Sequence, residues 1–146
     1  MVLWRISRHR DLSGVGGLKA AGRWQYAGQP VVYLAESPSA ALWEVCVHTS
    51  ANEVPPEFTL LRIEGPEVDI RVVNLEDLSA AWSTSLEETR DLGTEWLRGN
   101  KGVMLQVPSA IVPETANFLF NPLRPDAAKF RIAEVRSYRF DMRIKR

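Results

Sequence analysis

A single glutamate lies in the most apolar helical stretch of the chain. Residues 38–49 follow Ser37, a good helix N-cap, and begin with Pro38, which is favoured at the first helical position, so the sequence predicts a helix there. Apolar side chains cover most of its circumference, and Glu44 is its only acid. A helix of this kind is usually buried, and a buried glutamate needs a partner. Either Ser37, Glu44 and His48 form a polar edge that faces water, or Glu44 is held in the wall of a cleft.

Two arginines and a tyrosine raise the same question. Arg5 interrupts an apolar strand pattern, and Arg23 stands between Gly22 and Trp24 after a glycine-rich segment. The planar guanidinium fork suits a phosphate or a carboxylate, although either arginine could instead be a surface group or half of a structural ion pair. Tyr33 also fits a core position with a satisfied hydroxyl. Taken singly, these residues do not define a site.

The composition excludes several kinds of site. Cys46 is the only cysteine, so an intrachain disulfide and a cysteine metal cluster are excluded, and two histidines cannot form a three-histidine zinc site. We therefore expect no metal. The glycines of residues 14–17 neither follow a clear strand nor open a helix, which argues against a dinucleotide-binding Rossmann motif.

Charge and hydropathy limit the partners and the location. Lys and Arg number 18, as do Asp and Glu, and this balance disfavours a broad nucleic-acid surface, although residues 124–146 are basic. No apolar run is long enough to span a membrane, and the N-terminus lacks the pattern of a signal peptide. The expected location is cytoplasmic, with no membrane contact.

The elements that must position these residues follow from periodicity and turn residues. About seven short strands and two helices, without regular alternation, predict one α+β domain, residues 1–146, with a mostly antiparallel or mixed sheet. The four glycines of residues 13–22 predict a loop, and Gly93 is a weak point in the second helix. The predicted strands are 2–6, 31–35, 58–64, 68–73, 103–107, 118–120 and the late stretch 130–144, and the predicted helices are 38–49 and one within 85–98.

Several short motifs occur in a fixed order and together resemble the RES domain, over about Arg5 to Arg143. Their order is more specific than any one motif. Many members of that family have a histidine where this chain has Arg124, so we assign that position no catalytic role. The motifs are Gly22-Arg23-Trp24, Gly28 to Ala35, Ala41-Leu42-Trp43-Glu44, Leu92 to Leu97, Val107 to Pro113 and Asn117 to Asp126.

The resemblance implies a fold and a set of site residues. RES-domain toxins are similar to ADP-ribosyltransferases and diphtheria-toxin-like enzymes, which bind NAD in a cleft of a split, mixed β-sheet. Matched motif by motif, the implied catalytic residues are Arg23, Tyr33 and Glu44. The implied substrate-binding residues are Arg5, Ser109, Asn117 and Asn121, without a decision between the two asparagines.

The resemblance also implies an activity and a partner. The expected toxin cleaves the nicotinamide–ribose bond of NAD, which is a substrate and not a cofactor, and causes growth arrest. Phosphate, water or a protein side chain would accept the ADP-ribosyl group, which corresponds to an NAD phosphorylase, an NAD glycohydrolase or a protein mono-ADP-ribosyltransferase. An Xre-like helix-turn-helix antitoxin would block the site, and DNA would be contacted only through it. The competing hypotheses are an RNA-cleaving toxin and a non-catalytic binding module.

Overall fold

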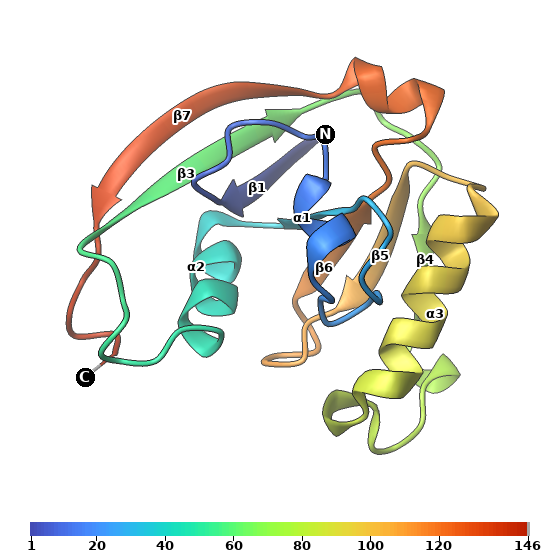
Figure 1. Ribbon diagram of the computed structural model, residues 1–146, viewed down its shortest axis with the longest axis horizontal. Helices are drawn as coiled ribbons and strands as arrows, with labels where there is room; N and C mark the ends of the chain where they lie inside the picture. The colour runs from blue at the N-terminus through green and yellow to red at the C-terminus, as the bar shows by residue number, and fades with distance from the viewer. Residues whose placement is uncertain (146) are drawn as a thin grey trace.

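The computed structural model describes residues 1–145 and contains a seven-stranded sheet flanked by helices (Figure 1). The strand order is β4-β5-β6-β2-β1-β3-β7, and every neighbouring pair is antiparallel except β4 and β5, which are parallel. The predicted α+β class with a mixed sheet is therefore confirmed. The strands are β1 Val2–Ile6, β2 Val32–Ala35, β3 Glu57–Glu64, β4 Arg71–Val72, β5 Met104–Pro108, β6 Ala116–Phe120 and β7 Arg131–Arg139. The helices are α1 Val15–Lys19, α2 Pro38–Val47 and α3 Leu86–Gly99, with short 3-10 turns η1 Leu75–Asp77, η2 Trp82–Thr84 and η3 Pro125–Lys129.

The sheet is nearly divided between β1 and β2. These strands are joined through a single pair, Trp4 opposite Ala35, whereas β1 pairs with β3 along its whole length. The long strands β3 and β7 curve away from β2, β6 and β5, with α2 below them and α3 on the other side of the molecule (Figure 1). A sheet that separates in this way leaves space between its halves, because backbone pairing no longer holds the two strands together there.

Two apolar clusters lie on the opposite faces of the sheet. Strand alternation distributes the residues, since Phe118 and Phe120 of β6 enter one cluster and Leu119 enters the other. The second cluster joins Trp96 and Leu97 of α3 to Trp24, which lies next to the predicted Arg23. Packing of α3 on the sheet therefore also fixes the segment that carries Arg23.

Several local predictions need correction. The loop predicted at 13–22 contains the short helix α1. The strand predicted at 68–73 is reduced to β4, which forms one edge of the sheet and is separated from β3 by four other strands. Helix α2 is not buried all round, because Trp43 and Val47 are about half exposed, at 52% and 54%. Gly93 does not interrupt α3, which runs from residue 86 to residue 99. Within the described part of the chain, none of the helices has the length and apolar character to cross a membrane.

Candidate active site

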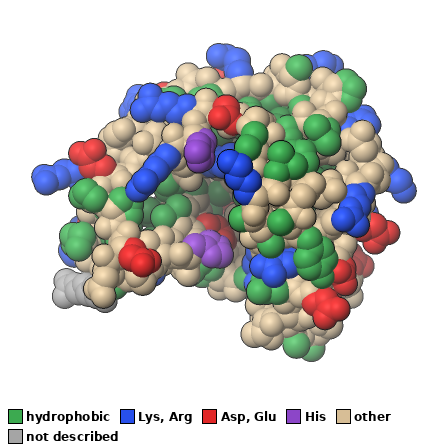
Figure 2. All heavy atoms as spheres, in the orientation of Figure 1, with side chains coloured by type: hydrophobic (Ala, Val, Ile, Leu, Met, Phe, Trp, Pro, Cys, Tyr) green, Lys and Arg blue, Asp and Glu red, His purple; other side chains and the backbone are tan. Residues whose placement is uncertain are grey.

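The gap between the halves of the sheet contains a cavity of about 660 Å³. Residues of β1 and β2 line it together with α2, the loop before β2 and the first turns of α3. The face shown in Figure 2 is hollowed between the part that carries α2 and the part that carries α3, with basic and histidine side chains around the hollow. Five of the seven residues predicted from sequence line the cavity: Arg5, Arg23, Tyr33, Glu44 and Asn117.

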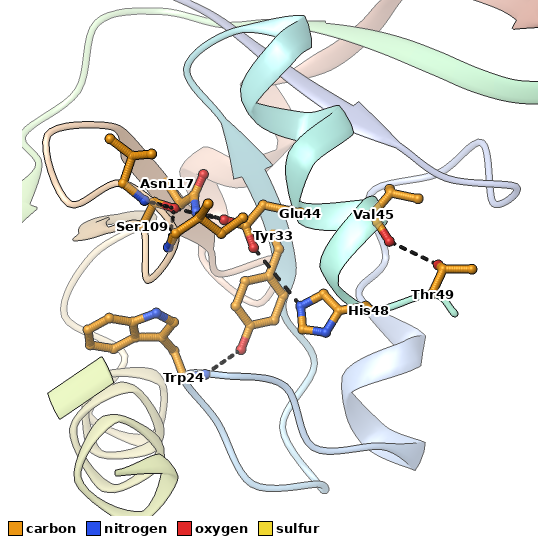
Figure 3. Close-up of polar contacts among 10 residues, drawn as sticks. Trp24, Tyr33, Glu44, Val45, His48, Thr49, Ser109 and Asn117 are labelled. Carbon is orange, nitrogen blue, oxygen red and sulfur yellow. Dashed lines mark hydrogen bonds and ion pairs between the residues drawn. The ribbon is translucent and has the colours of Figure 1, made fainter. Parts of the chain in front are cut away.

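Glu44 points from α2 into this cavity, where its carboxylate is oriented by two neighbours (Figure 3). Its Oε1 accepts hydrogen bonds from the Ser109 hydroxyl at 3.0 Å and from the Asn117 amide nitrogen at 2.8 Å. Its Oε2 is 4.0 Å from Nε2 of His48, one helical turn away. The Glu44 side chain is 29% exposed, and its Oε1 is fixed by two hydrogen bonds, whereas Oε2 has only the His48 contact within residues 1–145. Of the two interpretations of Glu44, the structure supports the wall of a cleft.

Ser109 does not line the cavity, but its hydroxyl donates a hydrogen bond to Glu44. It is 3% exposed, and its hydroxyl oxygen accepts a hydrogen bond from the Ile111 amide at 3.1 Å. With the oxygen engaged in this way, the hydroxyl hydrogen is directed to Glu44. Asn117 of β6 donates from the other side, and its Oδ1 is buried without a partner among residues 1–145. That oxygen is an unused acceptor beside the carboxylate.

The side chain of Arg23 is held by contacts with the η2 segment. Its Nη2 donates to the carbonyl oxygens of Trp82 at 3.2 Å and Ser83 at 2.5 Å, and its guanidinium lies 5.7 Å from the centre of the Trp82 ring. Its Nε is buried without a hydrogen-bond partner in the described part of the chain. Burial lowers the pKa of Arg23, Glu44 acts in the opposite direction, and the nearby charge of Arg90 lowers it further. The guanidinium remains charged and retains donor capacity toward the cavity.

The ring of Tyr33 lines the cavity, whereas its hydroxyl forms hydrogen bonds with the loop that carries Arg23 (Figure 3). The hydroxyl oxygen accepts from the Trp24 amide at 3.0 Å, and the hydroxyl donates to Oε1 of Gln25 in a short hydrogen bond. Burial raises the pKa of Tyr33 well above its usual range, with the Trp24 hydrogen bond acting in the opposite direction. Tyr33 therefore remains a neutral phenol and connects β2 to the loop that carries Arg23.

We expect Tyr33→Phe to destabilise the fold by about 1–3 kcal/mol, because the Trp24 amide and Gln25 lose a partner in a largely buried setting. Urea unfolding monitored by fluorescence measures the change. Tyr26→Phe is the control, since the Tyr26 hydroxyl bonds Asp91 at 2.7 Å on the surface and its loss should cost no more than about 0.5–1 kcal/mol. Equal losses for the two variants would contradict the anchoring role of the Tyr33 hydroxyl.

Arg5 approaches the cavity from β1. Within residues 1–145 its side chain forms neither a hydrogen bond nor an ion pair, which is unusual for a partly buried guanidinium. Burial lowers the pKa of Arg5, and the charge of Asp11 acts in the opposite direction. An unpaired arginine in such a place is suited to an anion that enters the cavity.

Sequence reasoning missed the support that α3 gives to the Arg23 loop. The Thr89 hydroxyl donates to the Arg23 carbonyl at 2.6 Å, and Nε of Arg90 donates to the Gly22 carbonyl at 2.8 Å. Thr94 accepts from the Tyr26 amide at 2.9 Å. The available signal was the polarity of these residues on the face of α3 that turns inward, because a polar group on a buried face requires a partner.

Asn121 lies outside the cavity, although the motif match proposed it as a substrate-binding residue. It is 1% exposed, its amide nitrogen donates to Oδ1 of Asn100 at 3.0 Å, and its Oδ1 accepts from the Leu123 amide at 3.1 Å. Arg124 also binds this region, donating to the Asn100 carbonyl at 2.8 Å. Asn100 is the C-cap of α3 and has a positive φ of 49°. Asn121 and Arg124 therefore stabilise the C-terminal end of this helix by hydrogen bonds to Asn100. Of the two asparagines, Asn117 is the one in the site.

The comparisons with known proteins agree with this architecture. The RES domain family model matches residues 2–142. The chain is 45% identical to "Toxin Res" of Pseudomonas putida over 146 residues, which cover 99% of both chains. It is 32% identical to the "Prs ADP-ribosylating toxin" of Sphingobium sp., covering 98% of this chain and 96% of that protein. The crystal structure of the M. tuberculosis MbcT–MbcA toxin–antitoxin complex contains a chain with a TM-score of 0.72 and 18% identity, covering 98% of this chain and 85% of that one.

The chain belongs to the RES domain family, because the family match and the relatives extend over nearly its whole length. The curated relatives place it in the toxin class of that family. The structural likeness supports the ADP-ribosyltransferase-like fold expected from the motifs, with its mixed, divided sheet and few helices.

Proposed function

We propose that this toxin binds NAD in the cavity and breaks the bond between nicotinamide and ribose. The observation that carries the proposal is the position of Glu44, whose carboxylate is fixed by Ser109 and Asn117 in a cavity that also presents unpaired arginines. A dinucleotide needs both kinds of group, a carboxylate at the reacting sugar and cations at the diphosphate. The name of the Sphingobium relative, an ADP-ribosylating toxin, supports chemistry on the same bond.

Glu44 is the proposed catalytic residue. When the C1–N bond of the nicotinamide riboside breaks, its electron pair goes to the pyridinium nitrogen, and the ribose acquires oxocarbenium character. A fixed carboxylate stabilises that positive charge and accepts hydrogen bonds from ribose hydroxyls. Nicotinamide leaves as a neutral base, so the step does not require a general acid. Oε2 of Glu44 is the atom available to the sugar, since it accepts no hydrogen bond within residues 1–145 and has only His48 at 4.0 Å, whereas Oε1 accepts two hydrogen bonds.

The remaining site residues bind and orient the substrate in this proposal. Arg23 and Arg5 would hold the diphosphate by charge-assisted hydrogen bonds. The Tyr33 ring would pack against the nicotinamide or the ribose, while its hydroxyl keeps the Arg23 loop in place. Asn117, whose amide nitrogen holds Glu44, would complete the polar wall of the site.

Phosphate or water is the acceptor that we propose, which makes the protein an NAD phosphorylase or glycohydrolase and NAD its substrate. In each case an acceptor oxygen forms the new bond to C1 as nicotinamide leaves, and the acceptor loses one proton to solvent. Transfer to a protein side chain is the second candidate, favoured by the name of the Sphingobium relative, an ADP-ribosylating toxin.

We further propose that a cognate antitoxin controls this site, because the similar MbcT fold was solved in a toxin–antitoxin complex. An Xre-like helix-turn-helix protein that inserts a segment into the cavity would cover the arginines and exclude NAD. DNA contacts would then belong to the antitoxin. We place the activity in the cytoplasm, where the NAD pool is located.

Incubation of the purified chain with NAD, with and without inorganic phosphate, tests this function. Chromatography is expected to show one nicotinamide released per NAD consumed, with ADP-ribose 1-phosphate formed when phosphate is the acceptor and ADP-ribose formed when water is. Induced expression should lower cellular NAD in parallel with growth arrest. Label from adenine-labelled NAD that collects on a protein would instead favour protein ADP-ribosylation. No nicotinamide release under any of these conditions would refute the proposal.

A further inference from the structure

The walls of the cavity contain more positive charge than the motif residues account for. Besides Arg5 and Arg23, a third arginine lines it, Arg90 of α3, and Glu44 is the one carboxylate among the lining residues. Three arginines and one glutamate leave a charge of +2 with His48 neutral. Within residues 1–145, no carboxylate forms an ion pair with any of the three arginines. Several guanidiniums without an ion-pair partner around one cavity favour the binding of an anion there.

Arg90 is positioned as a ligand-binding residue by its own hydrogen bond. Its Nε donates to the Gly22 carbonyl at 2.8 Å, and this bond sets the plane of the guanidinium. Its two terminal nitrogens have no hydrogen-bond partner among residues 1–145, and the side chain is only partly buried at the cavity wall. These nitrogens form a free edge that can donate two parallel hydrogen bonds to a phosphate.

The same contacts place Arg90 beside Arg23. Thr89 and Arg90 bind consecutive carbonyls of the loop, those of Arg23 and Gly22, so the two arginines lie on one wall. The charge of Arg90 also lowers the pKa of Arg23, which agrees with this proximity. Two like charges on one wall are unfavourable in the empty cavity, and a ligand with two negative charges relieves that repulsion.

We propose that Arg90 is a further diphosphate-binding residue of this site, which adds to Arg23 and Arg5 and shares one wall with Arg23 to hold the two phosphates of the dinucleotide. The inference rests on the proposed function, since it takes NAD as the ligand. Each phosphate of a dinucleotide diphosphate carries one negative charge, so the two charges match the two guanidiniums of Arg23 and Arg90. Arg90 contributes to substrate affinity more than to the chemical step, because it contacts the part of the ligand that does not react.

Calorimetric binding of ADP-ribose to the full chain tests the role of Arg90. ADP-ribose retains the diphosphate and is not turned over. We expect Arg90→Gln to weaken binding by about 10- to 100-fold, the size of one strong charge-assisted contact. Arg90→Lys retains the positive charge but loses the Nε hydrogen bond to Gly22 and the bidentate contact with a phosphate, so we expect a loss of affinity clearly smaller than that of Arg90→Gln. The control is Arg98→Gln, which removes the same charge from the exposed side of α3 and should leave affinity unchanged.

Two further readouts separate binding from a structural role. With NAD, Arg90→Gln should raise KM and leave kcat within about threefold. Nicotinamide riboside has no phosphate, and its turnover should be the same in Arg90→Gln and the native protein. Equal and large losses of affinity in Arg90→Lys and Arg90→Gln would show that Arg90 only supports the loop, and would overturn the proposal.

The outcomes also distinguish this inference from the function on which it rests. Unchanged ADP-ribose affinity in Arg90→Gln, with a native protein that binds and consumes NAD, would reject Arg90 alone. A native protein that binds inorganic pyrophosphate through Arg90 but not ADP-ribose would retain the anion site and reject NAD as the ligand. A native protein that binds neither compound would reject both.

Discussion

Glu44→Ala should lower the rate of NAD consumption by at least about 100-fold, the largest effect on activity that we expect from one substitution in this chain. The Glu44 carboxylate is the one negative side chain among the residues lining the cavity, and its Oε2 accepts no hydrogen bond within residues 1–145, so that oxygen can face the ribose. Its removal leaves no group to stabilise positive charge on the sugar as the bond breaks. Nicotinamide release by the purified variant, measured at saturating NAD, gives the change in kcat.

Two companion variants separate the charge of Glu44 from its structural contacts. Glu44→Ala leaves Ser109 and Asn117 without their acceptor and should cost about 1–2 kcal/mol of stability. Glu44→Gln retains an oxygen acceptor for both and should be nearly as stable as the native chain, yet equally inactive. Glu36→Ala removes an exposed glutamate just before α2 and should change neither property. Native activity in a folded Glu44→Gln protein would remove Glu44 from the catalytic role.

Gly93→Ala should destabilise the protein by about 2–4 kcal/mol, the largest effect on stability that we expect. A Cβ at residue 93 would overlap the carbonyl oxygen of Trp24 and lie 2.8 Å from its carbonyl carbon. Neither side can easily move, because Trp24 is 3% exposed and its amide is held by Tyr33. Helix propensity alone predicts the opposite sign, since alanine stabilises a helix interior by about 1 kcal/mol relative to glycine. Thermal unfolding of the two proteins decides between these signs.

Gly99→Ala is the matched control on the same helix. A Cβ at residue 99 would meet only the flexible side chain of Lys101, at 3.8 Å or more. That substitution should be neutral or stabilising by up to about 1 kcal/mol. Because Trp24 adjoins Arg23, we also expect Gly93→Ala to lose activity at temperatures where it remains folded. A Gly93→Ala protein as stable as the native chain would show that α3 and the Trp24 segment can separate without cost.

Local sequence patterns were sufficient for most of the regular elements. Ser37 and Pro38 define the start of α2 as the structure has it, because capping depends on residues adjacent in the chain. Alternation located β1 in the same way, whereas the late stretch predicted at 130–144 contains β7 but extends five residues beyond its end at Arg139. The position of β4 was not predictable from such patterns, since the partner of a two-residue strand depends on pairing with β5, more than thirty residues away.

The sequence by itself determined the family, the α+β class and the residues of the motifs, because each is encoded in residue types and their order along the chain. Only the tertiary structure decided where those residues lie and what they contact. It placed Asn117 against Glu44 and Asn121 at the end of α3, although both belong to one motif. It also brought Thr89, Arg90 and Gly93 against the Arg23 loop, across more than sixty residues of sequence. The physical reason is that a hydrogen bond or a steric contact depends on distance in space, which local periodicity does not specify.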